Sequence, residues 1–284
     1  MSEILQQAVL AFMLLTMMFA MGLRLTVADL RRALMDRTVV IACIAVNFLV
    51  LPLFALMLVK VFGLSPDASA GFLLCAAAPG ATMTTLLSRN TRADVPMAVG
   101  LLLLLVILSA FLTPLIAKWL FVQAGLSSAS MNAVGAVLYL LSIQIVPLAL
   151  GMVVRANAPE RAERWEAKVS RLATIVLLVV IVGMTAANFG IAKEIGAAGF
   201  GAMAAFMVVA TGAGVLVPRP PPARVACAFA FGAQNIALAT LLAERYLAKE
   251  ALIVVLMFGL VTYLVLLPLV PVFRRWIERT SPEN

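Results

Sequence analysis

The sequence predicts an all-α protein that crosses a membrane about nine times, and three observations support this prediction. First, 64% of the 284 residues are hydrophobic and 12% are charged, with a mean hydropathy of +1.11, whereas soluble domains are roughly half apolar and a quarter charged. Second, apolar runs of the ~20 residues that a bilayer core requires recur along the chain. Third, basic residues punctuate those runs. We therefore expect one integral membrane domain over residues 1–284.

The apolar runs give nine expected spans, bounded by charged breaks and turn-forming sequences. They cover residues 4–23, 38–59, 69–88, 95–121, 131–154, 172–189, 198–217, 225–243 and 251–273. The run Pro218 to Pro222 is a break that no helix can cross. The first run lacks a preceding basic segment and a cleavage site for signal peptidase, so we expect it to be retained as a helix.

The segment from Pro159 to Leu172 mixes acidic and basic residues with Trp165. Charges three and four positions apart pair on a helix surface, and an aromatic residue suits the membrane interface. We expect a short amphipathic helix on the membrane surface, acting as a solvated connector before the sixth span.

The distribution of Lys and Arg predicts the topology of the chain. With nine spans, the loops on one side contain five of the 21 basic residues and those on the other side contain sixteen. The five are Lys60, Lys118, Lys193, Arg245 and Lys249. Because cytoplasmic loops carry the excess of Lys and Arg, we expect a plasma (inner) membrane protein with an outside N-terminus and a cytoplasmic C-terminus.

Several functional classes conflict with this composition. The net charge of +8 is dispersed among loops rather than gathered on one face, so no nucleic acid partner is expected. The three cysteines, Cys43, Cys75 and Cys227, lie inside apolar runs and are interpreted as buried hydrophobic residues. The sequence has no histidine, and its acidic residues fall in loops or at span ends. A hydrolase or a proton relay needs such groups at the site, so we expect a protein that is not an enzyme. No obligate protein partner and no cofactor are evident.

Neutral polar residues cluster in two spans. The third span places Pro79 and Gly80 at its middle, followed by Thr82, Thr84 and Thr85. Proline removes a backbone donor and glycine weakens a helix, and broken helices in corresponding halves indicate a transport site. The alternative is ordinary helix packing, in which Pro, Gly and Thr are common.

The eighth span carries Gly232 and the adjacent amides Gln234 and Asn235. Two buried amides need several partners each, so ordinary packing explains this pair less well. Asn47, which precedes Pro52 in the second span, is a further candidate for the site. The freed N-termini of broken helices favour an anion.

Four stretches resemble the signature of the bile acid:sodium symporter family. They are Met18 to Leu25 with Asp29 following, Asn47 to Pro52, Ala78 to Thr82 leading to Asp94, and Gly232 to Asn235. The resemblance runs in order over nearly the whole chain, and the four motifs in register make it fairly specific.

The resemblance implies a secondary carrier built from inverted repeats, with a panel bundle, a core bundle and two crossed broken helices. The first helix of the family's ten-helix pattern is missing here, which leaves nine. The panel would comprise residues 4–23 and 131–189 and the core residues 38–121 and 198–273, with 274–284 as a short cytoplasmic tail.

The chain departs from the pattern of sodium-coupled members. The resemblance places Ala230 where those members carry a glutamate, Thr84 and Thr85 where they carry Ser-Asn, and Asn47 where they carry a glutamine, while Gln234 and Asn235 are retained. Sodium prefers hard oxygen ligands that include a carboxylate, because burying an ion costs several kcal/mol. The positions Thr84, Thr85, Asn47, Ala230 and Gln234 therefore predict degenerate sodium sites.

Our leading hypothesis from the sequence is a carrier of a small organic anion, bile-acid-like or another carboxylate, with weak or absent sodium coupling. Gln234 and Asn235 would donate hydrogen bonds to it, Thr82, Thr84 and Thr85 would line the opposite wall, and Asn47 would support the crossing. The alternatives are a fully sodium-coupled symporter that uses neutral oxygen ligands, a membrane ligand sensor on the same fold, and a channel. A sensor would need a signalling domain, and a channel would need a lined pore.

Overall fold

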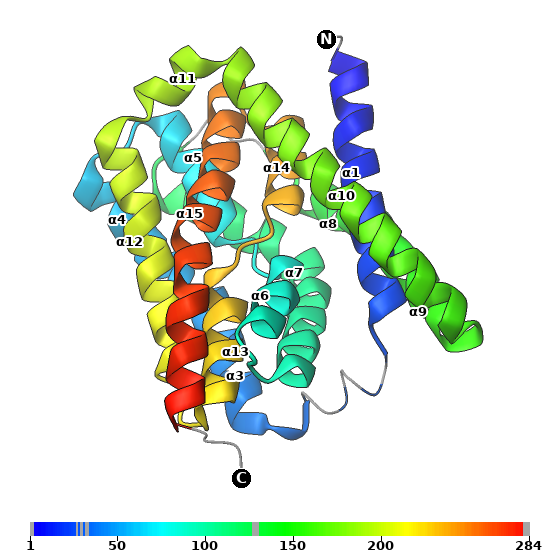
Figure 1. Cartoon of the computed structure of the whole chain (residues 1–284). Coiled ribbons are helices and arrows are strands. Elements are labelled where there is room, and N and C mark those ends of the chain that lie inside the picture. Colours follow the sequence, from blue (N-terminus) through cyan, green and yellow to red (C-terminus); the bar gives the residue numbers. More distant parts are fainter. Residues whose placement is uncertain (1–2, 27, 29–30, 32–33, 127–130, 281–284) are drawn as a thin grey trace.

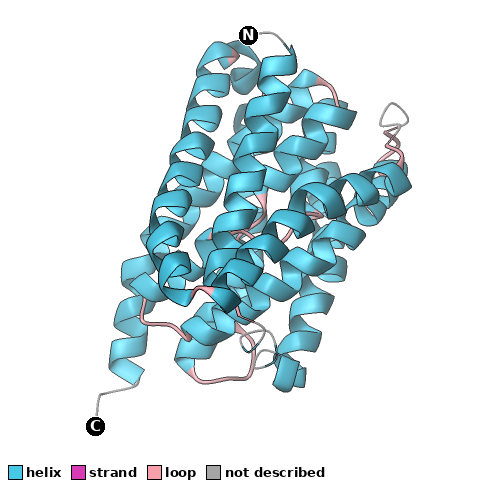
Figure 2. Cartoon of the chain, turned by 90° about the vertical axis from the view of Figure 1, so that its right-hand side faces the viewer, coloured by secondary structure: helices cyan, strands magenta, loops and turns pink. Residues whose placement is uncertain are grey.

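The computed structural model describes residues 3–26, 28, 31, 34–126 and 131–280, and these residues form helices without named strands (Figures 1 and 2). Six of the helices are long and apolar enough to cross a membrane. The helix α1 (Glu3–Arg24) and two broken helices complete nine crossings within the described residues. The prediction of an all-α polytopic protein is confirmed.

The first half of the chain contains four crossings. They are α1; α3 (Arg37–Ala45), η1 (Val46–Val50) and α4 (Leu51–Phe62); the broken pair α5 (Pro66–Ala76) and α6 (Met83–Asn90); and α7 (Val95–Gln123). Proline in the first turn and a polar residue before it start several helices, because proline needs no donor there and the side chain accepts a free amide. Thus Ser65 caps α5 and Asp94 caps α7.

The second half contains five crossings. They are α8 (Ala133–Leu140), η2 (Leu141–Ile145) and α9 (Val146–Asn157); α10 (Pro159–Ala187), followed by the short α11 (Phe189–Glu194); α12 (Gly196–Val215); the broken pair α13 (Pro221–Gly232) and α14 (Ile236–Tyr246); and α15 (Lys249–Thr280). The start of α1 and the end of α15 lie at opposite ends of the molecule (Figure 1).

One expected boundary was wrong. The segment from Pro159 to Leu172 is not a separate surface helix, because it forms the first turns of the uninterrupted helix α10. The charged residues that suggested a surface position form the first turns of α10, and the apolar residues of the sixth span follow in the same helix. Helix α15 extends to Thr280, so residues 274–280 of the expected tail are helical.

The helices pack in two groups. The side group consists of α1, α8, α9 and α10, with α1 packed against both α9 and α10. The main group consists of α3 to α7 and α12 to α15, and it includes a cluster of phenylalanine rings between α5, α12 and α15. The two groups meet where α1 contacts α14, α10 contacts α15 and α8 contacts α7. Figure 1 shows the side group on the right of the main group.

Large apolar side chains cover much of the outer surface. Val61 on α4, Val179 on α10 and Val208 on α12 are each more than 60% exposed. Contiguous apolar surface is rare on soluble monomers, whereas lipid tails accept it. The surface therefore suits a lipid bilayer.

An ion pair joins the start of α3 to the loop before α13. Arg219 donates to both carboxylate oxygens of Asp36, at 2.5 and 2.7 Å. The Arg219 guanidinium holds the pKa of Asp36 below its ordinary value. Asp36 also accepts from the Val39 amide, so one carboxylate caps α3 and ties two distant segments together.

Glycines at Gly22 and Gly151 let α1 and α9 approach closely. A Cβ on Gly151 would collide with the Phe19 carbonyl and lie 2.8 Å from the Gly22 Cα atom. We expect Gly151→Ala to lower the free energy of unfolding by about 2 kcal/mol or more, because backbone atoms of α1 cannot move aside cheaply. Thermal unfolding of the protein in detergent measures this.

Gly212→Ala on α12 is the matched control for Gly151→Ala. A Cβ there meets nothing within 4 Å, so alanine should stabilise α12 by up to about 1 kcal/mol through its helix propensity. Equal effects of the two substitutions would contradict the packing that we describe.

Candidate functional site

The first broken helix is interrupted by Pro79 and Gly80. Helix α5 ends at Ala76 and α6 begins at Met83. Pro79 has no amide to continue α5. Gly80 adopts φ +98° against α7, where a Cβ would lie 3.2 Å from the Val106 amide nitrogen. Both residues therefore act as predicted from the sequence.

The second break lies between Gly232, which ends α13, and Ile236, which begins α14. A Cβ on Gly232 would collide with the Thr211 hydroxyl on α12. Ala233 is extended, and the side chain of Asn235 caps α14 by accepting from the Leu238 amide at 3.1 Å. The polar residue after the break thus restarts the helix.

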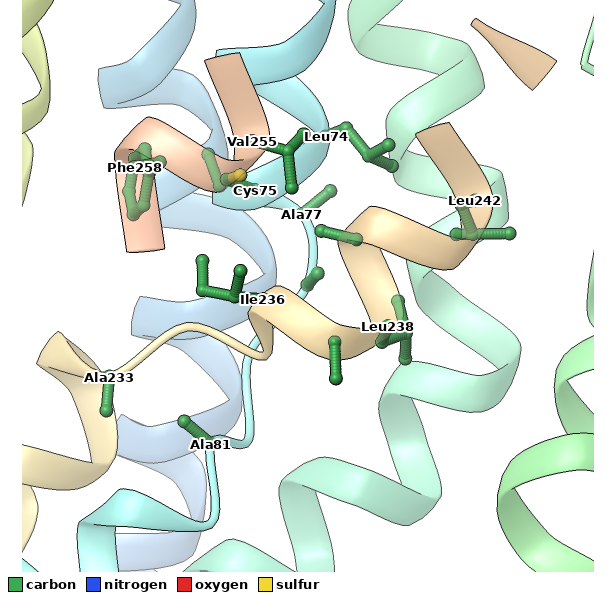
Figure 3. Packing of buried hydrophobic residues seen from close by; sticks show 14 of the residues in the cluster. Leu74, Cys75, Ala77, Ala81, Ala233, Ile236, Leu238, Leu242, Val255 and Phe258 are labelled. Atoms are coloured by element: carbon green, nitrogen blue, oxygen red, sulfur yellow. The ribbon is translucent and has the colours of Figure 1, made fainter. Parts of the chain in front are cut away.

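The two breaks cross each other inside the bundle. Pro79 and Gln234 form an isolated antiparallel bridge, and the backbone N–H of Asn235 donates to the backbone carbonyl of Ala78 at 2.6 Å. Figure 2 shows these loops midway along the helices, and Figure 3 shows the segment near Ala81 passing beside that near Ala233 and Ile236. The prediction of two crossed broken helices is confirmed.

The carbonyls that end the half-helices accept bonds from nearby side chains. Thr113 on α7 donates to the Ala77 carbonyl at 2.7 Å. Thr84 donates to the Phe229 carbonyl at 3.3 Å, and Gln234 Nε2 donates to the Phe231 carbonyl at 3.1 Å. Broken backbone inside a membrane must be satisfied by protein or water. Here hydroxyl and amide groups satisfy it.

The adjacent amides leave one free acceptor and one free donor. Gln234 Oε1 and Asn235 Nδ2 are buried and make no hydrogen bond in the described structure. The other atom of each amide is fixed by its partner, because the Phe231 carbonyl can only accept and the Leu238 amide can only donate. This pair matches a group that both donates and accepts, such as a hydroxyl. The sequence had suggested two donors.

A cavity of about 140 Å³ lies between the side group and the main group. Its walls come from α1 and α10 on one side and from α6 and α15 on the other, with Thr82 and Thr85 among the lining residues. A neighbouring cavity of about 30 Å³ is lined by Gln234, Asn235 and Thr82. Thr82, Met83 and Tyr263 are among the residues that line both. The structure thus places four of the six predicted binding residues around these cavities.

Asn47 and Thr84 line neither cavity. Asn47 lies in the π-helical turn η1, where its Nδ2 donates to the Cys43 carbonyl at 2.9 Å and its Oδ1 has no hydrogen-bond partner among the described residues. Thr84 is buried against α13. Thr84 therefore fits support of the crossing, whereas the Asn47 side chain donates within its own helix.

The position Ala230 is packed in apolar surroundings. It belongs to a buried cluster with Val39, Cys43, Leu101, Leu105, Val217, Cys227 and Phe231. Within the described residues, no three His, Cys, Asp or Glu side chains gather to hold a metal ion. A cation at this position would therefore meet mostly apolar atoms.

Sequence reasoning missed one polar side chain at the site. Arg24 had been counted as a loop residue, yet it lines the larger cavity, donates to the Thr85 hydroxyl at 2.8 Å and pairs with Glu166. Gln144 lies in the second π-helical turn, η2, and donates to the Val106 carbonyl on α7 at 2.6 Å. Arg24 belongs to the Met18 to Leu25 motif, whereas Asp29 lies outside the described residues.

Comparison with known proteins agrees with this geometry. The profile of the Sodium Bile acid symporter family matches residues 11–195. The sodium/bile acid cotransporter 4 of Rattus norvegicus is 29% identical over 199 residues, which are 67% of this chain and 45% of the rat protein. The Homo sapiens protein of the same name is 28% identical over 203 residues, 68% of this chain and 46% of the human one.

A plant relative shows a weaker similarity. The probable chloroplastic sodium/metabolite cotransporter BASS1 of Arabidopsis thaliana is 28% identical over 134 residues, 47% of this chain and 32% of the plant protein. The chain therefore spans about half the length, or less, of these relatives. The profile ends before α12, so the second broken helix lies outside the matched residues.

Proposed function

The chain belongs to the sodium bile acid symporter family, and on this premise we propose that it is a secondary carrier of a small organic anion. The observation that carries the proposal is the crossing of α5–α6 and α13–α14, which brings two half-helix N-termini beside the smaller cavity, lined by neutral polar groups. Such N-termini carry partial positive charge and favour anions.

Alternating access follows from the two helix groups in this proposal. The side group acts as the panel and the main group as the core, and the cavities lie at their boundary. Rocking of one group against the other would expose the crossing first to one side of the membrane and then to the other. With the N-terminus outside, as the Lys and Arg distribution favours, the Arg24 end of the cavity faces the cytoplasm.

The ligand in this proposal carries an anionic group and a hydroxyl-like group. Gln234 Oε1 and Asn235 Nδ2 supply one acceptor and one donor for the hydroxyl-like group. Thr82 lines both cavities and joins them. A hydroxylated carboxylate, whether small or of the size of a bile acid, has both features.

Sodium coupling is proposed to be weak or absent. Ala230 offers no oxygen from its side chain, and the carbonyls of Ala77, Phe229 and Phe231 already accept hydrogen bonds from side chains. A sodium ion would have to compete for these oxygens without a carboxylate to offset its desolvation.

Uptake into proteoliposomes tests both parts of the proposal. We expect saturable uptake of radiolabelled cholate or mandelate, with counterflow, that changes less than threefold when choline replaces sodium at equal membrane potential. A tenfold drop on sodium removal would show a fully coupled symporter with neutral ligands. Binding without counterflow would instead indicate a ligand sensor.

A further inference from the structure

We propose that Arg24 binds the carboxylate of the transported anion and that Glu166 occupies this same subsite as an internal competitor. The inference rests on the proposed function and assigns the anionic end of the ligand to one side chain. It differs from the crossing itself, because Arg24 lies on α1 and Glu166 on α10, both in the side group.

The geometry around Arg24 is that of a carboxylate site. Its Nη2 pairs with Glu166, its Nη1 donates to the Thr85 hydroxyl at 2.8 Å, and its Nε is buried without a hydrogen-bond partner in the described structure. Guanidinium binds carboxylates through two parallel bonds. Arg24 therefore holds one carboxylate and keeps a further donor that this carboxylate does not use.

The charges of the cavity favour exchange of one carboxylate for another. Among the described residues that line the larger cavity, Arg24 and Glu166 are the charged side chains. Their side chains are 22% and 17% exposed, so the pair is largely desolvated but still reached by water. When a ligand carboxylate replaces Glu166, the charge-assisted bonds on Arg24 are restored and Glu166 can turn toward solvent.

The Arg24 interactions also cross between the helix groups. Thr85 lies on α6 in the main group, so the bond from Arg24 joins the two groups beside the cavity. A fixed guanidinium supplies positive charge to the anion without a co-transported cation. This is consistent with the loss of the carboxylate position at Ala230.

A purely structural role would make the pair a tie between α1 and α10. The two roles predict different effects of Glu166→Gln on ligand affinity. If the pair is only a tie, the substitution lowers stability and changes ligand binding little. If Glu166 competes with the ligand, the substitution raises carboxylate affinity, because Arg24 is left without its internal partner.

Binding of three acid and amide pairs to the purified protein tests the proposal. The probes are mandelate and mandelamide, benzoate and benzamide, and cholate and cholamide, measured by calorimetry in detergent. We expect wild type to bind at least one acid ten or more times tighter than its amide. Arg24→Gln should remove this preference by lowering the affinity for the acid roughly 10-fold or more. Glu166→Gln should raise the affinity for the acid severalfold.

The double variant Arg24→Gln with Glu166→Gln keeps the test decisive, because it leaves no unpaired charge that would unfold the protein. It should be folded, by thermal unfolding, and should show no acid preference. An acid preference retained by both Arg24 variants overturns the assignment of Arg24. Weaker acid binding by Glu166→Gln overturns the competition. If wild type binds none of the three acids, the proposed carboxylate transport itself fails.

Discussion

Replacing both Gln234 and Asn235 by alanine is expected to abolish binding of the acid that wild type binds, with at least a 100-fold loss of affinity. The two side chains present the free acceptor and the free donor of the smaller cavity. Removing groups that hydrogen-bond a ligand in a buried site costs roughly 10- to 100-fold each. Calorimetry on the purified variant measures the loss.

The double alanine variant also changes the fold locally, so folding and binding must be separated. Asn235 caps α14, and losing this cap costs about 1 kcal/mol. Asn235→Ser keeps an oxygen for the cap but lacks the amide donor. We therefore expect Asn235→Ser to unfold at nearly the wild-type temperature yet to bind the acid at least tenfold more weakly.

Thr240→Ala is the matched control for the amide pair. Thr240 lies on α14 and is fully buried, its hydroxyl makes no hydrogen bond to a described residue, and it lines neither cavity. Its removal should leave binding unchanged. Undiminished binding by the double alanine variant would refute the role of the amides, whereas an equal loss in Thr240→Ala would show a general effect on α14.

The features that the sequence predicted are those encoded by short, strong local signals. Pro79 with Gly80 breaks one helix, and Gly232 with the adjacent amides breaks another. Nine crossings follow from apolar runs between charged breaks. Each of these signals acts within a few residues, so pattern reading recovers it.

The features that were missed depend on contacts between distant segments. In the sequence, Arg24 was interpreted as a loop charge at the end of a span that indicates topology. In the structure its long side chain reaches back into the cavity and pairs with Glu166, which lies 142 positions later in the chain. The charged start of α10 was interpreted as a surface helix because its contact with a distant segment is not visible in the sequence. No local pattern reveals that one of its charged side chains, Glu166, pairs with Arg24 on α1.

The role expected for Asn47 shows a related limit. Its polarity was visible in the sequence, but its partner, the Cys43 carbonyl, lies within its own helix. Asn47 is buried in the π-helical turn η1. Polarity alone therefore identified a buried residue but could not distinguish a ligand contact from a structural one.

Gly80→Ala is expected to lower the free energy of unfolding by about 3 kcal/mol and to abolish transport. At φ +98° a side chain costs about 1–3 kcal/mol. A Cβ would also lie 3.1 Å from Val106 Cγ2 and 3.2 Å from the Val106 amide nitrogen. Because the crossing joins Asn235 to Ala78, displacement of this segment moves the amide pair as well. Thermal unfolding and proteoliposome uptake measure the two effects.

Gly63→Ala separates backbone strain at Gly80 from collision with α7. Gly63 ends α4 at φ +60°, and a Cβ there meets nothing within 4 Å. This control should therefore lose only about 1 kcal/mol and keep transport. Adding Val106→Ala to Gly80→Ala removes the nearest side-chain atom, so it should restore part of the stability. The same small loss in both glycine variants, with transport intact, would show that the crossing does not depend on close contact with α7.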